Sequence, residues 1–150
     1  MHLATYVGLL HSSERALADA FRAVGEDHGP DVRHLCRLLA GQADAHVERL
    51  APVVERYGEQ RETEPERLRA AEFGGTRTGG AGLLRDLQDL YVLASFVDVT
   101  WTVVGQAAQA LRDAELLDVV SGCEQETKRQ LGWLTTRIKQ TAPQALVVAK

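Results

Sequence analysis

Apolar side chains recur every three or four residues over four long stretches of this 150-residue chain. The stretches run from Leu3 to Val24, from Val32 to Tyr57, from Leu83 to Leu111 and from Leu117 to Ile138. This spacing matches one face of an α-helix, whereas a half-buried strand alternates every second residue. The pattern therefore predicts four long helices and gives no support to parallel strands.

Turn residues mark where these helices end. Gly29 and Pro30 suit the end of one helix and the first turn of the next, so the first two helices are expected to form a tight hairpin. One continuous helix over the last two stretches, about 60 residues, would reach roughly 90 Å. A turn from Arg112 to Glu115 is the better interpretation, with Asp113 as the N-cap. The predicted helices cover about 2–28, 31–57, 82–112 and 115–141, and Pro143 closes the last one.

The segment 58–81 between the second and third helices is polar and rich in glycine. Thr63 and Glu66 have capping-box spacing, which predicts a short helix at about 64–73. Two hairpins joined by such a long link are typical of an up-and-down bundle. We therefore predict an all-α, antiparallel four-helix bundle with one long crossover between the second and third helices, in a single domain, 1–150.

Charge and composition exclude several partner classes. The net charge of −4 comes without a dense Lys/Arg stripe, so no nucleic-acid partner is expected. Glu14 and Arg15 interrupt the N-terminal segment too early for an export signal, and the two cysteines lack metal-binding or redox spacing, so we predict a cytoplasmic protein. The stretch 90–111 has Asp98 as its only charge, but its Thr, Ser and Gln content favours a buried helix over a membrane span.

Each predicted helix carries a polar residue near its middle. Glu14 and His46 replace apolar residues in the first two stripes, and Asp98 lies just beside the third. In the fourth helix, Glu124 competes with Cys123 for the inward position. A charged carboxylate in an apolar core is costly unless it is paired or bound to metal. These residues therefore predict a polar layer inside the bundle, although the outward orientation of Asp98 or Glu124 remains open.

Two interpretations of this layer stay open. In the first, Glu14 and His46 form a hydrogen-bonded pair without metal, assisted by Gln42 one turn before His46. In the second, Glu14, Asp98 and Glu124 supply oxygen ligands and His46 an imidazole to a single iron, manganese or zinc ion. His11 faces the same way as Glu14, so it and Gln42 are additional candidate ligands.

With these residues at mid-helix, the chain resembles the ferritin-like superfamily, in particular rubrerythrin-type and small bacterial ferritin-like proteins. That family builds its di-iron centre from single Glu residues on two helices and a Glu-x-x-His motif on each of the other two. The resemblance implies that Glu14 and Asp98 stand at the single-Glu positions. His46 lacks the Glu three residues before it, and Glu124 lacks the His three residues after it. The implied di-iron ligand set is incomplete.

Three hypotheses about function follow. The lost ligands favour a non-catalytic bundle that acts by self-association, as a homodimer, or through a protein partner, helped by the apolar third helix and the tail 145–149. The second hypothesis is a metal-dependent oxidoreductase or metal-storage protein that uses the mid-bundle carboxylates and histidine. The third is a small-ligand binding bundle. Its pocket would be lined by Tyr91, Ala94, Trp101, Gly105 and Ala108.

Overall fold

The computed structural model describes residues 2–58 and 73–148. It contains four long helices, α1 (His2–Asp27), α2 (Pro30–Tyr57), α3 (Gly79–Leu111) and α4 (Ala114–Pro143), followed by one turn of π-helix at Gln144–Val148. No strand occurs in these two described ranges. The prediction of an all-helical protein with four long helices is confirmed. The short helix predicted at about 64–73 lies almost entirely outside the described residues, and Phe73 itself is not helical.

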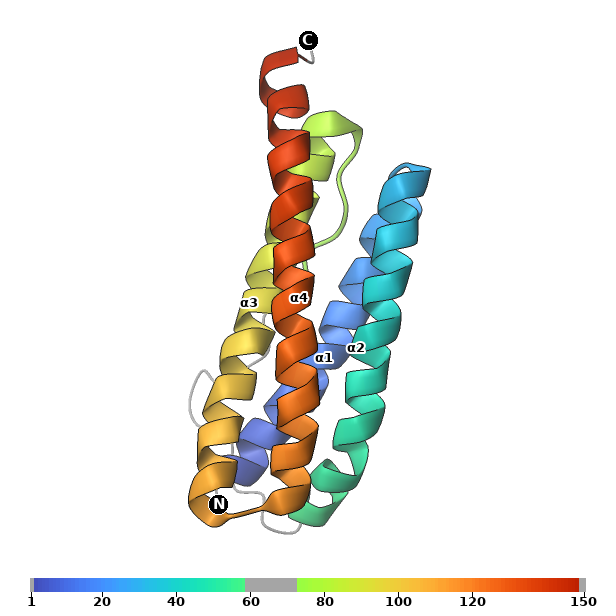
Figure 1. Ribbon diagram of the computed structural model, residues 1–150. Coiled ribbons are helices and arrows are strands. Elements are labelled where there is room, and N and C mark those ends of the chain that lie inside the picture. The colour runs from blue at the N-terminus through green and yellow to red at the C-terminus, as the bar shows by residue number, and fades with distance from the viewer. Residues whose placement is uncertain (1, 59–72, 149–150) are drawn as a thin grey trace.

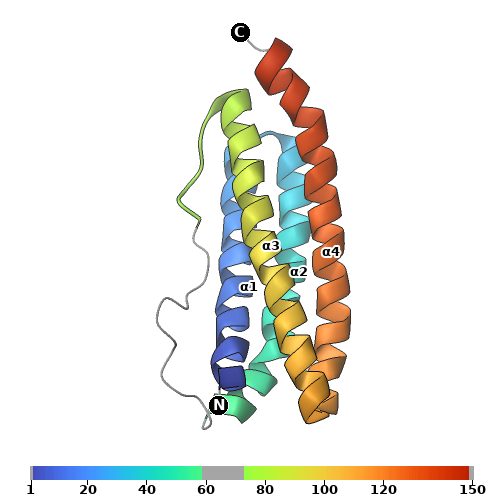
Figure 2. The same ribbon diagram turned by 90° about the vertical axis from the view of Figure 1, so that its left-hand side faces the viewer.

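The helices pack lengthwise, with α1 beside α2 and α3 beside α4 (Figures 1 and 2). Gly29 has an extended backbone and Pro30 is the first residue of α2, as the sequence predicts for the first turn. At the other turn, Arg112 adopts a left-handed backbone with φ of 55°. Asp113 then caps α4, because its side chain accepts a hydrogen bond of 3.1 Å from the Leu116 amide. The predicted N-cap is confirmed.

A polar contact joins this turn to the end of α2. The Tyr57 hydroxyl donates to Asp113 Oδ2 at 2.6 Å, and Arg56 Nη2 donates to the same oxygen at 2.7 Å. Asp113 thus serves as the N-cap of α4 and as the acceptor for two side chains of α2. This arrangement places the carboxyl end of α2 against the α3–α4 turn.

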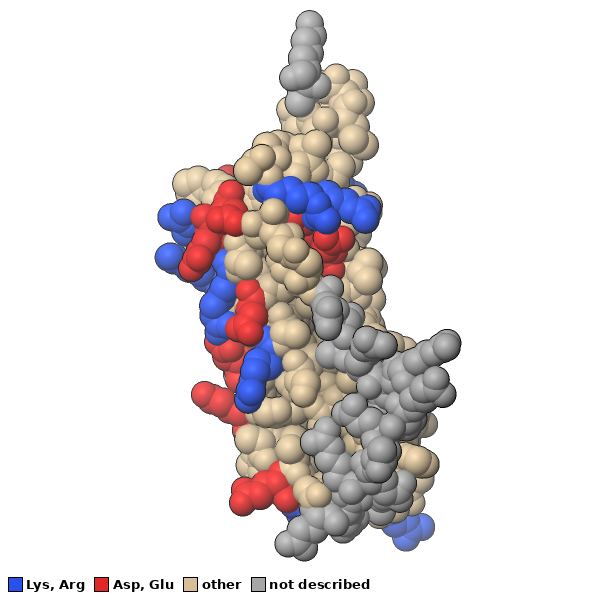
Figure 3. Space-filling model, turned by 180° about the vertical axis from the view of Figure 1, so that it is seen from behind, with Lys and Arg blue, Asp and Glu red and all other residues tan. Residues whose placement is uncertain are grey.

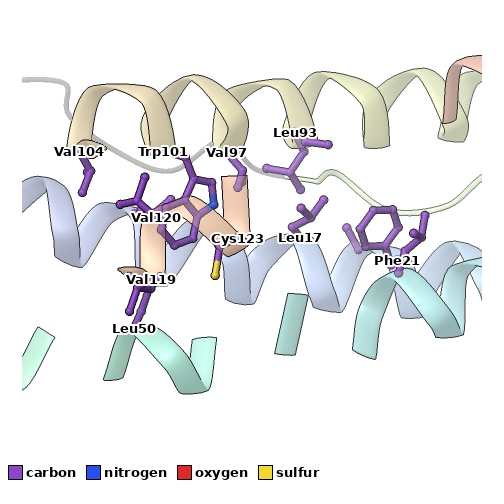
Figure 4. Packing of buried hydrophobic residues seen from close by; sticks show 14 of the residues in the cluster. Leu17, Phe21, Leu50, Leu93, Val97, Trp101, Val104, Val119, Val120 and Cys123 are labelled. Atoms are coloured by element: carbon purple, nitrogen blue, oxygen red, sulfur yellow. The ribbon is translucent and has the colours of Figure 1, made fainter. Parts of the chain in front are cut away.

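The interior of the bundle is filled by large apolar side chains from all four helices. Figure 4 shows Leu17 of α1 beside Leu93 and Val97 of α3, with Phe21 one turn further along α1. Most of these side chains are fully buried, and burying a large apolar side chain stabilises the fold by roughly 1.5–3 kcal/mol. Packing of this kind surrounds the polar residues of the first two helices and keeps water away from them.

The third helix is apolar on two faces. Its inner face, which includes Val97, Trp101 and Val104, is fully buried, but Val92 and Val99 on the outer face keep 64% and 54% of their surface exposed. By length and composition, α3 is apolar enough to cross a membrane, a property that core helices of soluble proteins share. The inner face is apolar because it packs in the bundle core. No residue in the described part of the chain covers the apolar outer face.

The last helix decides a choice that its sequence left open. Cys123 is fully buried and Glu124 is half-buried, so Cys123 takes the inward position. The fully buried residues of this helix are Leu116, Cys123, Thr127, Gln130 and Leu134. Pro143 is the last residue of the α-helix, as predicted, and the chain continues into the π-helical turn Gln144–Val148.

Candidate functional site

A buried carboxylate and a buried imidazole meet between α1 and α2. Glu14 has no exposed surface and His46 retains 2%. The Oε1 atom of Glu14 lies 3.1 Å from Nδ1 of His46. Each residue occupies a position where its helix otherwise presents apolar side chains to the core, so the same periodicity that buries those neighbours carries these two polar groups inward.

The third helix contributes an indole to this pair. Trp101 is fully buried, and its Nε1–H donates to Glu14 Oε1 at 3.0 Å. The ring planes of Trp101 and His46 are nearly perpendicular, at 86°, with ring centroids 6.1 Å apart. Figure 4 shows Trp101 extending from α3 into the interior beside Cys123. One oxygen of Glu14 therefore accepts two hydrogen bonds from two different helices.

The fourth helix supplies a second carboxylate. Glu126 Oε1 lies 3.0 Å from Nε2 of His46, and 34% of the Glu126 side chain is exposed. Both ring nitrogens face carboxylate oxygens, an arrangement that favours the doubly protonated imidazolium form of His46. Burial of the ring disfavours its charged form and lowers the pKa of His46. The hydrogen bonds and negative charges of Glu14 and Glu126 favour the charged form more strongly. The pKa of His46 is therefore raised.

The surroundings of this cluster carry one further positive charge and one thiol. Arg49 Nη1 lies 3.7 Å from Cys123 Sγ. Burial raises the pKa of the Cys123 thiol to about 12, so the thiol is protonated and inert. The Oε2 atom of Glu14 is buried and has no hydrogen-bond partner. The cluster thus contains the carboxyl groups of Glu14 and Glu126, the imidazole of His46 and, among the described residues, one buried oxygen without a partner.

The structure brings together two of the four predicted ligands. Asp98 and Glu124 instead approach Lys128 Nζ on the surface, at 3.0 Å and 3.5 Å, and their side chains are 22% and 28% exposed. Glu124 also accepts a hydrogen bond of 3.0 Å from Thr102. The prediction that Asp98 and Glu124 belong to the polar layer is therefore wrong, because Lys128 holds both carboxylates at the α3–α4 surface.

The two additional candidates lie elsewhere as well. His11 is half-buried in α1, and burial together with the charge of Arg15 lowers its pKa. Gln42 accepts a hydrogen bond of 3.2 Å from Gln130 Nε2, one turn from the cluster on α2. Within the described residues, neither side chain forms a hydrogen bond with Glu14 or His46.

Glu126 and Trp101 are members of the site that sequence reasoning missed. The sequence signal for Glu126 is the alternative orientation of the fourth helix, in which Cys123 rather than Glu124 faces the core. With Cys123 inward, the residue three positions later lies on the same side of the helix and reaches the edge of the core. Trp101 carries an indole N–H that needs a hydrogen-bond acceptor when the side chain is buried, and this requirement is the signal that points to it.

This arrangement can hold a proton between a buried and a partly exposed carboxylate. His46 links the two, so a proton on either ring nitrogen is within hydrogen-bond distance of an acceptor. Within residues 2–58 and 73–148, no group of three or more His, Cys, Asp or Glu side chains has metal-binding geometry. Metal binding at this cluster therefore stays a prediction.

A second polar cluster lies at the end of the bundle that holds the α1–α2 turn. Asp86 of α3 is fully buried; its Oδ2 lies 2.8 Å from His28 Nε2 and accepts from the Arg77 amide at 3.0 Å. The Arg77 guanidinium donates to Asp86 Oδ1 and to Asp89, both at 2.8 Å. These contacts attach the loop before α3 to the α1–α2 hairpin, and they satisfy every oxygen of the buried carboxylate.

The residues proposed for a small-ligand pocket do not share one cavity. Ala94, Trp101 and Ala108 are fully buried in the packed core, and Tyr91 is 37% exposed. Gly105 lies beside a surface hollow of about 250 Å³ between α3 and α4. The inner face of α3 is thus used for packing against the other helices.

Comparisons of the chain with protein-family models, with curated proteins and with solved structures found no match. Function is therefore inferred from the residues and their geometry alone.

Proposed function

We propose that the chain is a non-catalytic, ferritin-like four-helix bundle that works by associating with a second copy of itself through the outer face of α3. The observation that carries this proposal is the exposure of Val92, Val99 and Val103, which keep 64%, 54% and 46% of their surface accessible. These residues recur at a spacing of seven and four along α3, so they form one stripe, which we call the α3 outer stripe. Half-buried Phe96 lies within it.

The direction of the helices supports the ferritin-like part of the proposal. In Figure 1 the chain runs upward in α1, downward in α2 and α3, and upward in α4. The end of α2 and the start of α3 thus lie at opposite ends of the bundle, and the intervening chain has to connect them. An antiparallel bundle with one long crossover has this connectivity.

The absence of charge on the α3 outer stripe favours a second copy as its partner. Between Asp89 and Arg112 the only charged residue is Asp98, and that carboxylate is already paired with Lys128. Figure 3 shows charged side chains gathered along one edge and at the upper end of the visible face. Two identical apolar stripes can meet about a twofold axis without burying an unpaired charge, as in most homodimers. Exposed Leu146, Val147 and Val148 add apolar surface at one end of the bundle.

The molar mass in solution tests this proposal. Sedimentation equilibrium or gel filtration with light scattering at micromolar concentration is expected to show a dimer of the 16.4 kDa chain. Val99→Glu places a charge in the centre of the α3 outer stripe and is expected to give a monomer with unchanged helix content. Gln109→Glu adds the same charge to an exposed position of the same helix, away from the stripe, and is expected to remain dimeric. A monomeric wild-type protein contradicts the proposal.

A metal-binding role is the second candidate, favoured by the buried Glu14 oxygen that lacks a partner beside an imidazole. Glu14 and His46 suit a single iron, manganese or zinc ion, for which His46 would have to lose a proton. We expect any uptake to increase with pH and to be lost in His46→Ala, whereas Glu48→Ala, an exposed change on the same helix, keeps it. Elemental analysis after incubation with each metal is the measurement. Unchanged metal content in His46→Ala excludes this site.

A further inference from the structure

Arg137 is a partly buried cation that has no counter-ion among the residues that the structure describes. Its Nε atom is buried and has no hydrogen-bond partner, and the described residues provide no carboxylate in contact with its guanidinium. Among the described arginines, Arg22 is also of intermediate exposure, and it pairs with Asp19 at 3.2 Å and with Asp44. A guanidinium withdrawn from water loses hydration that only a hydrogen-bonding partner can replace. The Arg137 guanidinium therefore lacks, among the described residues, the hydrogen-bond acceptor that its burial requires.

A cavity of about 460 Å³ lies beside Arg137, between the start of α3 and the end of α4. Its polar side carries Arg137, Gln140 and Thr141. Its apolar side is formed by Leu83 of α3 and by Ala145 and Val148 of the π-helical turn. The volume falls within the roughly 300–1,000 Å³ of small-molecule sites. The cavity thus offers hydrogen-bond donors at one side and an apolar surface at the other.

The charged side chains of residues 127–148 and 32–43 are all positive, and Asp86, which follows Leu83 by one turn on α3, is already paired with Arg77 and His28. No Asp or Glu occurs from residue 127 to residue 148, whereas Arg129, Arg137 and Lys139 lie in that segment of α4. The facing part of α2, residues 32–43, also lacks acidic residues and carries Arg33 and Arg37. The first turn of α3 contains no acidic side chain either. An anion entering the cavity would meet no unpaired like charge from these elements.

We propose that this cavity binds a small monocarboxylate with an apolar chain of medium length, such as a fatty acid of about ten carbons. The carboxylate pairs with the Arg137 guanidinium, which suits planar, two-point recognition, and the Gln140 amide supplies a further donor. The apolar chain lies against Leu83, Ala145 and Val148. A neutral ligand would leave Arg137 unpaired, and a cationic ligand would be repelled by it. This site is separate from the α3 outer stripe, and the proposal does not rest on self-association.

The carboxylate requirement is tested first with the full chain. Isothermal titration with decanoate below its micelle-forming concentration is expected to show saturable binding with one site, and decanol is expected to bind at least about tenfold more weakly. Arg137→Gln is expected to weaken decanoate binding by about tenfold or more, to the level of decanol. Arg129→Gln removes an exposed charge from the same helix and is expected to bind decanoate as the wild type does. Equal affinity in Arg137→Gln and Arg129→Gln overturns the proposal.

The position of the apolar chain is tested with a matched pair of bulky substitutions. A second hollow of about 330 Å³ shares Arg137 and Gln140 but is lined on its other side by Leu35, Trp133 and Thr136. Ala145→Phe fills the proposed cavity and is expected to abolish decanoate binding, whereas Thr136→Phe fills the second hollow and is expected to preserve it. The opposite result overturns the assignment to this cavity, provided that circular dichroism shows both variants folded.

A membrane lipid with an anionic headgroup is the alternative ligand, because it also joins a negative charge to an apolar chain. Flotation with vesicles of phosphatidylcholine, with and without an anionic phospholipid, separates it from a free carboxylate. Decanoate binding without vesicle binding supports the proposal. Binding to anionic vesicles without any binding of decanoate overturns it.

Discussion

The Nδ1 atom of His46 lies 3.1 Å from Oε1 of Glu14, and this contact joins two residues that are 32 positions apart on different helices. Trp101 and Glu126 extend it, so one hydrogen-bonded cluster touches α1, α2, α3 and α4. A polar cluster of this kind requires its members to sit at the same height along the bundle. We expect it to select the register of the helices, a role that buried polar groups perform in some helical assemblies.

Removal of the buried carboxylate is expected to destabilise the fold. Glu14→Ala leaves the imidazolium of His46 with one carboxylate and the Trp101 N–H without an acceptor. We expect a loss of about 3 kcal/mol in the free energy of unfolding, measured by urea denaturation. Glu48→Ala, an exposed change on α2, is expected to change it by less than about 0.5 kcal/mol. Equal stability of the two variants contradicts the role assigned to Glu14.

The stability contributed by His46 is expected to depend on pH. Burial disfavours its charge, but Glu14 and Glu126 raise its pKa in the folded protein above the ordinary value of 6.5. A raised pKa means that the stabilisation is fully present below about pH 6.5 and is lost as the pH rises through the folded pKa. The stability difference between wild type and His46→Gln is therefore expected to shrink from about pH 6 to about pH 9. A difference that grows over that interval would show that the ring is neutral.

The cluster at Asp86 is expected to hold the loop before α3. Asp86→Asn replaces a fully buried carboxylate that binds His28 and Arg77. Because Arg77 is 43% exposed, its share is screened by solvent, and we expect a loss of about 2 kcal/mol in unfolding free energy. Faster hydrogen exchange in residues 73–78 should accompany it. Asp89→Asn, at a side chain that is 26% exposed, serves as the control and should cost less than about 1 kcal/mol.

Both cysteines are expected to resist thiol reagents while the protein is folded. Burial raises the pKa of Cys36 and of Cys123 to about 12, so the reactive thiolate is scarce at neutral pH, and both side chains are buried. We expect modification to be roughly 100-fold slower or more in the folded protein than in guanidinium. Ser121→Cys, at an exposed position of α4, supplies a reactive reference thiol. Rapid labelling of the native wild type would show that the core opens readily.

Much of the helical structure could be predicted from sequence because its signals are local. Helical periodicity, Gly29 followed by Pro30, and Asp113 as an N-cap depend on a few neighbouring residues, and the structure shows four helices and both turns at these places. The inward positions of Glu14 and His46 follow from the same periodicity, since each interrupts a clear apolar stripe. For these features the amino-acid sequence was sufficient.

The remaining members of the site were decided by tertiary packing. The packing of α4 buries Cys123 in place of Glu124 and brings Glu126 Oε1 to 3.0 Å from Nε2 of His46. The fourth helix carries plausible side chains for either orientation, so its periodicity alone does not choose between them. Likewise, Asp98 faces Lys128 only because α3 and α4 lie side by side. Such choices depend on contacts between residues far apart in the chain, and the energies of those contacts exist only once the helices have packed.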